Sequence, residues 1–230
     1  MSESDLRHRL AAILSADAAG YSRLMSADEQ ATIAALDGAR AVFRAQVEAN
    51  HGRVIDMAGD SVLAVFETAA GAATAAVAVQ RKLSASLDAM PEEQRMRFRI
   101  GVHLGDLIEK ADGTVYGDGV NIAARLQALA EPGGIRVSDA VRGAVRGKIG
   151  AGFVDEGEQT VKNIEHPVRV FKIVAAEPSP LPSSSLHLPD KPSLAVLPFT
   201  NMSGDPEQEY SPTASPKTSS PTCRRLPACS

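Results

Sequence analysis

Short apolar runs alternate with amphipathic stretches over most of the chain. Leu10–Ala16 and Ser61–Phe66 are mostly apolar, and Met96–Leu104 alternates apolar with polar side chains, so all three are predicted to be strands. Residues 28–49 and 68–89 repeat their apolar side chains at helical spacing. Helices that alternate with strands in this way predict an α+β fold in which helices cover one face of a sheet.

Several shorter elements are predicted between and after these. They are a hairpin over 53–66, a helix over 118–130, and strands at Ile135–Val137, Phe153–Asp155 and Val168–Val174. In the helix, the spacing of Ile122, Leu126 and Leu129 predicts that these three side chains form the buried stripe.

Composition excludes several classes of function. The 230 residues carry a net charge of −4, so no general positive field attracts nucleic acid or an anionic membrane. No run approaches the roughly 20 apolar residues of a membrane span. Both cysteines, Cys223 and Cys229, lie near the C-terminus, so the preceding residues have neither a disulfide framework nor a zinc–thiolate site. We therefore expect a cytoplasmic protein without a nucleic-acid partner.

Proline usage marks a domain boundary. Eleven of the 14 prolines follow residue 177, and serine is frequent among the first of them. Such a segment has little to bury and is typical of a linker. We predict a folded domain over residues 1–176 and a linker over residues 177–193.

Two aspartates stand where predicted strands end. Asp17 follows the run Leu10–Ala16, and Asp60 lies in the Ala58-Gly59-Asp60 turn of the hairpin. If the two strands lie side by side, the pair could hold two divalent cations, which would activate an attacking oxygen and stabilise a leaving phosphate. Magnesium favours such oxygen sites together with substrate phosphates. The alternative is that Asp60 is simply a turn former.

Three further groups are suited to a phosphorylated ligand. The small residues after Asp17 lead into a helix, so backbone N–H groups at Gly20, Tyr21 and Ser22 could hold phosphate. Asn121 and Arg125 are four residues apart on one helix face, where an amide and a guanidinium suit a sugar ring and a developing phosphoryl charge. Exposed pairs of this kind are also common on solvated helix surfaces.

Five segments, in order, resemble the catalytic domains of the class III adenylate and guanylate cyclases. The matching segments are Ala16–Ser22, Ala58–Phe66, Arg99–Gly105, Tyr116–Leu126 and Val161–Ile164. Together they extend over about residues 8–175. The resemblance implies the nucleotide cyclase fold, a ferredoxin-like or palm-type sheet with covering helices.

The resemblance also implies residue roles. Asp17 and Asp60 are similar to the two metal aspartates, with the Ala18 carbonyl as a further ligand for Mg²⁺ or Mn²⁺, two ions per site. Asn121 resembles the residue that orients the ribose, and Arg125 the one that stabilises charge on the α-phosphate.

Lys162 resembles the residue that contacts the terminal phosphates, although a lone loop lysine is more often merely solubilising. In the family the two sets of groups come from different subunits, so a chain with both sets implies a homodimer with composite sites. The implied reaction converts ATP to 3′,5′-cyclic AMP and pyrophosphate in intracellular signalling.

The base-recognition positions depart from the family pattern. Asp56 occupies the position of the usual adenine-reading lysine, whereas Thr114 is a residue seen there in many bacterial adenylate cyclases. A carboxylate accepts hydrogen bonds and cannot donate one to adenine N1. ATP is favoured by Thr114, and GTP or a loose base preference is the alternative. A catalytically silent domain that binds nucleotide or only dimerises is a further alternative.

Residues 194–230 resemble the truncated start of a second domain that follows rhizobial-type cyclase domains. Lys191–Tyr210 matches such a start, but Ser211–Ser230 changes abruptly to Ser, Pro and Thr with two cysteines. Reading the gene one nucleotide on would restore an acidic and apolar continuation, which suggests a frameshift. We expect this tail to be disordered.

Overall fold

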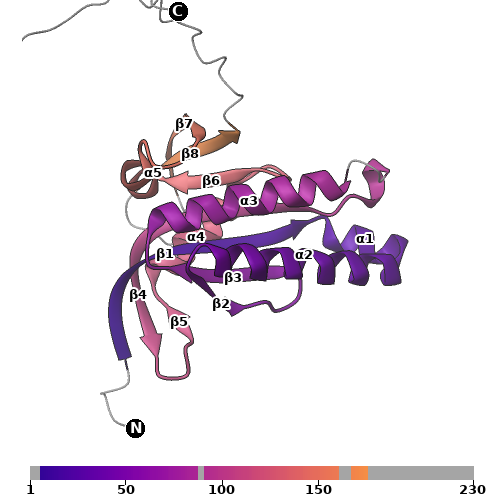
Figure 1. Cartoon of the computed structure of the whole chain (residues 1–230), viewed down its shortest axis with the longest axis horizontal. Coiled ribbons are helices and arrows are strands. Elements are labelled where there is room, and N and C mark those ends of the chain that lie inside the picture. Colours follow the sequence, from indigo (N-terminus) through magenta and orange to yellow (C-terminus); the bar gives the residue numbers. More distant parts are fainter. Residues whose placement is uncertain (1–5, 88–90, 161–166, 176–230) are drawn as a thin grey trace, which may run out of the picture. The chain divides into compact units, whose positions relative to one another are not determined.

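One mixed sheet runs through the computed structural model, which describes residues 6–87, 91–160 and 167–175. Its seven long strands follow the order β2-β3-β1-β4-β6-β8-β7, and the short β5 pairs with β4 (Figure 1). Among the strand pairs of the described residues, β4–β6 is parallel and the others are antiparallel. All described residues belong to the unit Met1–Ser179, one of two units into which the chain divides.

The elements follow one another with short connections. In chain order they are β1 (Leu6–Ala19), α1 (Tyr21–Ala27), α2 (Glu29–Ala49), β2 (Gly52–Asp56), β3 (Ser61–Phe66), α3 (Ala69–Leu87), the 3₁₀ helix η2 (Glu92–Gln94), β4 (Arg97–Lys110), β5 (Val115–Tyr116), α4 (Asp118–Leu129), β6 (Ile135–Ser138), α5 (Asp139–Val145), β7 (Ala151–Gln159) and β8 (Val168–Ala175).

The paired strands β1 and β4 form the centre of the sheet. They are antiparallel in unbroken register along their whole length, from Leu6 opposite Lys110 to Ala19 opposite Arg97. On its other edge, β1 pairs with β3 from Ala12 opposite Phe66 to Asp17 opposite Ser61. Asp17 therefore lies between two neighbouring strands, close to where β1 ends.

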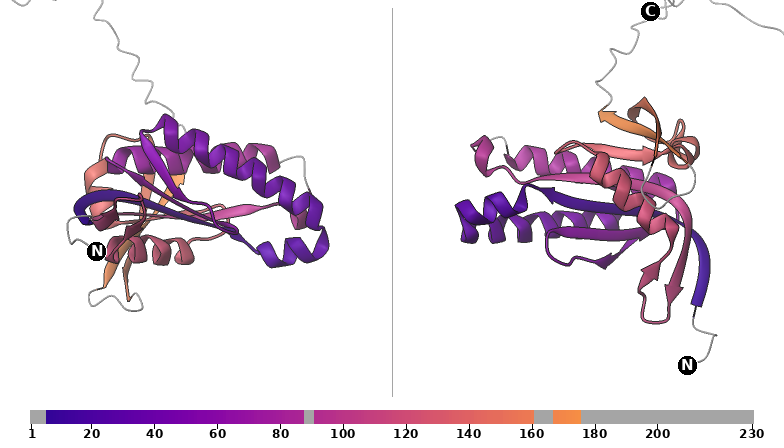
Figure 2. Two further views of the ribbon diagram at one scale, coloured as in Figure 1. Left: turned by 90° about the horizontal axis from the view of Figure 1, so that it is seen from below. Right: turned by 180° about the vertical axis from the view of Figure 1, so that it is seen from behind.

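Helices lie on both faces of the sheet. The larger apolar core includes Phe43 of α2, Val79 of α3 and Val141 of α5, packed against alternate residues of the strands. A smaller core on the opposite face includes Ala123 of α4 with Ile13 and other strand residues. Figure 2 shows α2 and α3 on one side of the sheet and α4 on the other. The expectation that only one face is covered is therefore wrong.

Two glycines allow α4 to pack directly on the strands. A Cβ atom at Gly101 of β4 would lie 2.2 Å from the carbonyl oxygen of Ala123 and 2.3 Å from the backbone nitrogen of Gln127. A Cβ atom at Gly119 of α4 would lie 2.8 Å from the carbonyl oxygen of Asp106. The helix backbone occupies the space of a missing side chain, which fixes how close α4 lies to the sheet.

The predicted elements exist, but the central strands are longer than the apolar pattern indicates. β1 extends beyond Leu10–Ala16 at both ends, and β4 continues to Lys110, beyond the predicted end at Leu104. β1 and β4 pair with each other over this whole length, and this pairing keeps both strands extended where the alternation of apolar and polar residues is weak. The hairpin, the pairing of β1 with β3, and helices over 29–49 and 69–87 are confirmed.

The predicted stripe of α4 is partly wrong. Leu126 is buried, but Leu129 is 44% exposed and Ile122 is only half-buried. The buried side of the helix instead consists of Gly119, Ala123, Leu126 and Gln127. Gly119 and Ala123 belong to this side because the helix backbone lies so close to β4, which apolar spacing alone does not reveal.

The close packing of α4 gives a stability prediction. Gly101→Ala should destabilise the protein by about 1–3 kcal/mol, because its Cβ atom can only be accommodated by moving helix backbone. Gly38→Ala in α2 is the control: its Cβ atom meets nothing within 4 Å, and helix propensity should add up to about 1 kcal/mol. Urea denaturation measures both changes, and equal stability of the two variants would contradict the packing argument.

Candidate active site

The turn between β2 and β3 places Asp60 next to Asp17. Gly59 has a φ of 57°, a left-handed conformation that favours glycine and lets the chain reverse. The amide of Ser61 closes the turn by donating to the carbonyl oxygen of Ala58 at 3.1 Å. The amide of Ala18 donates to the carbonyl oxygen of Asp60 at 3.2 Å, which ties the turn to β1.

Arg99 of β4 is the direct partner of Asp17. The two residues are opposite in the β1–β4 register, and the Arg99 Nη2 donates to the Asp17 Oδ2 at 2.6 Å. Opposite residues of an antiparallel pair point to the same face. Asp17 alternates with Ala16 and Ala18 of the larger core, so the ion pair lies on the face that carries α4.

The two carboxylates influence each other. Burial raises the pKa of Asp60 above its ordinary value, and the charge and hydrogen bonding of Asp17 raise it further. The backbone amide of Asp60 and the charge of Arg99 act in the opposite direction. The neighbouring acids therefore form a site at which an additional cation is electrostatically favoured.

The donor set of this site is small. Asp17 and Asp60 supply two carboxylates, and the Ala18 carbonyl was predicted to join them. In the described part of the chain, no group of three or more His, Cys, Asp or Glu side chains could hold a metal ion. Two carboxylates fit a Mg²⁺-type ion that takes its remaining ligands from water and phosphate, and they do not fit a closed protein cage.

The predicted phosphate-binding turn begins at the end of β1. Gly20 adopts a left-handed φ of 71° as the N-cap of α1, and its carbonyl oxygen accepts from the amides of Arg23 and Leu24. The amides of Tyr21 and Ser22 therefore lie at the open end of the helix. This end directly follows Asp17 and Ala18 in the chain.

Asn121 and Arg125 are exposed on α4. Among the described residues, neither is joined to Asp17 or Asp60 by a hydrogen bond or an ion pair. Both half-sites are nevertheless on the same face of the sheet, because α4 packs on the smaller core. One chain thus presents the acidic pair and the amide–guanidinium pair separately.

A β-bulge decides where Asp56 points. Val54 is opposite Ala64, but the register then shifts and Asp56 is opposite Leu63. Since Leu63 packs against the smaller core, Asp56 lies on the same face as Asp17.

Thr114 is half-buried in the β4–β5 connection, and Arg53 of β2 donates to the neighbouring Gly113 carbonyl oxygen at 3.3 Å. The two predicted base-recognition residues thus belong to adjoining elements.

Lys162, the predicted contact for the terminal phosphates, lies outside the described residues. His103 is largely buried on β4, with its Nδ1 2.9 Å from the Ser138 Oγ. Burial lowers the pKa of His103 to about 4, so its ring is neutral at physiological pH.

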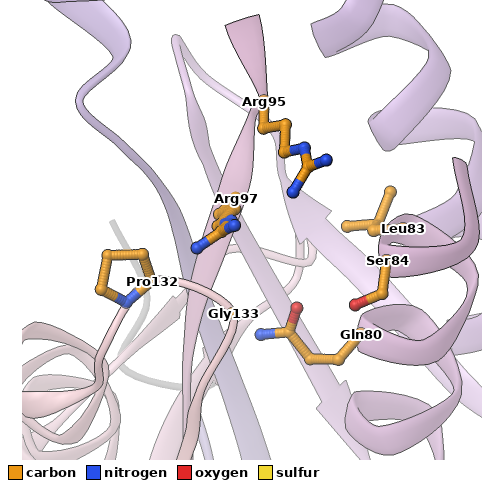
Figure 3. Close-up of a pocket in the computed structure, with 7 residues that line it drawn as sticks. All are labelled: Gln80, Leu83, Ser84, Arg95, Arg97, Pro132 and Gly133. Atoms are coloured by element: carbon orange, nitrogen blue, oxygen red, sulfur yellow. The ribbon is translucent and has the colours of Figure 1, made fainter. Parts of the chain in front are cut away.

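A cavity of about 270 Å³ lies away from these residues. Figure 3 shows its lining, in which the side chains of Gln80 and Ser84 from α3 lie across from Arg95 and Arg97. The Gln80 amide donates to the carbonyl oxygens of Phe98 and Gly134, which fixes its position. None of the predicted site residues lines this cavity, so it is not the space in which they would act.

Sequence reasoning missed Arg99. It lies within one of the recognised segments, but its role depends on being opposite Asp17, and a residue 82 positions away cannot be paired by local pattern. The available signal was the alternation of β4, which puts Arg99 on the face opposite the buried Phe98 and Ile100.

Comparison with known proteins shows which family this chain matches. Residues 5–175 match the family described as Adenylate and Guanylate cyclase catalytic domain. The Rhizobium meliloti (strain 1021) protein named "Putative adenylate cyclase 3" is 45% identical to this chain over 222 residues. The match covers 91% of this chain and 37% of that protein.

Solved structures similar to this chain come from cyclases as well. One of an adenylate/guanylate cyclase/hydrolase from Silicibacter pomeroyi is 38% identical with a TM-score of 0.69, covering 74% of this chain and 99% of that one. The adenylyl cyclase CyaB from P. aeruginosa is 19% identical with a TM-score of 0.66, covering 74% and 96%, and shows the fold alone.

The raised pKa of Asp60 predicts a stability change in metal-free protein. Asp60→Asn should increase the free energy of unfolding at neutral pH, because the folded state disfavours the ionised carboxyl group. The gain should shrink as the pH falls through the raised pKa of the folded state and should vanish below the ordinary value of 3.8, where the carboxyl group is protonated in both states. Urea denaturation in chelator across this pH range is the measurement.

Asp56→Asn is the matched control, because it removes an exposed carboxylate at the other end of the same turn. Its effect should stay within about 0.5 kcal/mol. A loss of stability in Asp60→Asn at neutral pH would contradict the electrostatic account of the site.

Proposed function

Because this chain belongs to the adenylate and guanylate cyclase catalytic domain family, we propose that it converts ATP to 3′,5′-cyclic AMP and pyrophosphate. The observation that carries the proposal is the side-by-side placement of Asp17 and Asp60, with Arg99 bound to the first of them. In this reaction the ribose 3′-oxygen attacks the α-phosphate in line with the departing pyrophosphate.

Asp17, Asp60 and the Ala18 carbonyl would hold Mg²⁺ or Mn²⁺, two ions per site. Such ions would activate the attacking oxygen and would neutralise charge on the leaving phosphates. These residues fit a divalent cation, because its positive charge would offset the burial and mutual repulsion of the two carboxylates. In the absence of a cation, Arg99 supplies part of that charge and holds the Asp17 carboxylate in place.

Arg99 and the start of α1 would bind the triphosphate. The Arg99 guanidinium is 2.6 Å from Asp17, so phosphate oxygens that reach the acidic pair also come within reach of this cation. Gly20, Tyr21 and Ser22 would add backbone amides at the open end of α1. Lys162 remains a predicted contact for the terminal phosphates.

Asn121 and Arg125 would act on a nucleotide held by the acids of a second copy. Asn121 would orient the ribose, and Arg125 would stabilise charge that develops on the α-phosphate. The support is their exposure on α4, on the same face as the acidic pair but without contact to it within the described chain. A head-to-tail homodimer would join the two sets into two equivalent sites.

Guanylate cyclase activity is the second candidate, and Asp56 favours it. The bulge in β2 turns this carboxylate to the site face, where it could accept hydrogen bonds from N1–H and the 2-amino group of guanine. Thr114 favours ATP. A silent nucleotide-binding or dimerising domain is the remaining alternative, and the intact acids and Arg125 argue against it.

The setting of the domain is also a proposal. The chain spans 37% of the length of the Rhizobium meliloti relative, so the activity and partners of a longer protein do not transfer directly. We propose that residues 1–176 form the catalytic domain, 177–193 the linker and 194–230 the start of a second domain. In the described part of the chain, no helix is long and apolar enough to cross a membrane; a cytoplasmic location remains a prediction.

A product assay on the purified full chain tests the activity. With Mn²⁺, wild type should form cyclic AMP from ATP, Asp60→Ala should form none, and Arg125→Ala should lose about 10²–10³ in kcat with little change in nucleotide binding. Cyclic GMP from GTP alone would make Asp56 the guanine-reading residue. No product from a folded dimer with either nucleotide would overturn the proposal in favour of a silent domain.

Mixing two inactive variants tests the composite site. Asp60→Ala and Arg125→Ala should regain about a quarter of wild-type activity at equal concentrations, because half of the dimers are mixed and each has one intact site of two. The control mixes Asp60→Ala with Asp17→Ala, whose lesions fall in the same half-site. Recovery in the control, or none in the first mixture, would contradict sites shared between two copies.

A further inference from the structure

Arg40 of α2 reaches the turn that carries Asp60, although the proposed reaction makes no use of it. Its Nη2 atom donates to the carbonyl oxygen of Met57 at 3.0 Å and to that of Gly59 at 2.6 Å. Its Nη1 atom lies 3.4 Å from the Asp37 Oδ1 atom, one helical turn earlier. The side chain is only 24% exposed, so it is held between α2 and the turn.

With Arg40 in place, four consecutive carbonyl groups of the turn have donors. Arg40 satisfies Met57 and Gly59, the Ser61 amide satisfies Ala58, and the Ala18 amide satisfies Asp60. The two donors from Arg40 come from outside the turn and its strands. Loss of the guanidinium would remove the partner of the partly buried Met57 carbonyl oxygen, which is costly, and would leave the exposed Gly59 carbonyl oxygen to water.

Arg40 contacts the backbone just before Asp60, and not its carboxylate. The charged groups that shift the pKa of Asp60 are Asp17 and Arg99, and Arg40 is not among them. Arg99 contacts a carboxylate of the pair directly, whereas Arg40 contacts the peptide groups on either side of Ala58. Gly59 is conformationally permissive, so the segment before Asp60 has little rigidity of its own.

We propose that Arg40 is a positioning residue, whose guanidinium holds the β2–β3 turn so that Asp60 lies beside Asp17 before a cation binds. The consequence for catalysis rests on the proposed function, but the consequence for the turn does not. Groups that orient a metal ligand typically contribute 10- to 100-fold in affinity or activity.

Hydrogen exchange on the metal-free full chain tests the turn directly. In Arg40→Met, the amides of Ser61 and Ala18 should exchange about 10-fold faster, as expected when about 1.4 kcal/mol of local stability is lost. The amides of Phe43 and Val47 in α2 should keep their wild-type rates. Arg44→Met is the matched control, since Arg44 is exposed one turn later on the same helix.

Binding of Mn²⁺ alone, followed by electron paramagnetic resonance, tests the link to the acids. Arg40→Met should weaken Mn²⁺ binding about 10- to 100-fold, Arg44→Met should not, and methylguanidinium should partly restore binding to Arg40→Ala. In an active enzyme, higher Mn²⁺ should also recover turnover of Arg40→Met but not of Asp60→Ala.

Three outcomes would overturn the proposal. They are unchanged exchange at Ser61 and Ala18, faster exchange throughout α2 and the sheet, and wild-type Mn²⁺ binding despite a loosened turn. Exchange and Mn²⁺ binding do not depend on turnover. A wild-type chain that makes no cyclic nucleotide would therefore contradict the proposed function, while these two measurements would still decide whether Arg40 positions Asp60.

Discussion

Repulsion between two neighbouring carboxylates is the constraint on which this end of the molecule depends. Asp17 and Asp60 come from adjacent strands, and the pKa of Asp60 is raised by burial and by Asp17. A fold that keeps them together must offset that cost. Arg99 does so by charge, through an ion pair with Asp17. Hydrogen bonds to the turn also help to keep the carboxylates together: the Ala18 amide donates to the Asp60 carbonyl oxygen, and the Arg40 guanidinium donates to that of Gly59.

The same strands fix the second half of the site. β4 carries Arg99 next to Asp17 and, two residues later, Gly101 beneath the backbone of α4. Because the helix lies directly on this glycine, the spacing between the acidic pair and the exposed Asn121 and Arg125 is set by one strand. Under the proposed mechanism the two groups act together only when a second copy is present.

Much of the fold followed from local pattern. Apolar runs located β1 and β3, helical spacing located α2 and α3, and the Gly59 turn placed Asp60 at a strand end. The missed features depend on contacts between distant residues. Arg99 is 82 positions from Asp17, and Arg40 is 19 from Gly59. The buried side of α4 was misjudged because the helix backbone packs directly on Gly101 of β4, so that Gly119 and Ala123 are buried while Leu129 is exposed.

The bulge in β2 shows how one residue can alter the chemistry of a site. In regular register with Val54 opposite Ala64, Asp56 would be opposite Val62, which belongs to the larger buried core. The shift places it opposite Leu63 instead, on the face of the acidic pair. A carboxylate buried in the larger core without a partner would be unfavourable, and the bulge turns Asp56 away from that core. The residue that departs most from the family pattern thus lies on the same face of the sheet as the acidic pair.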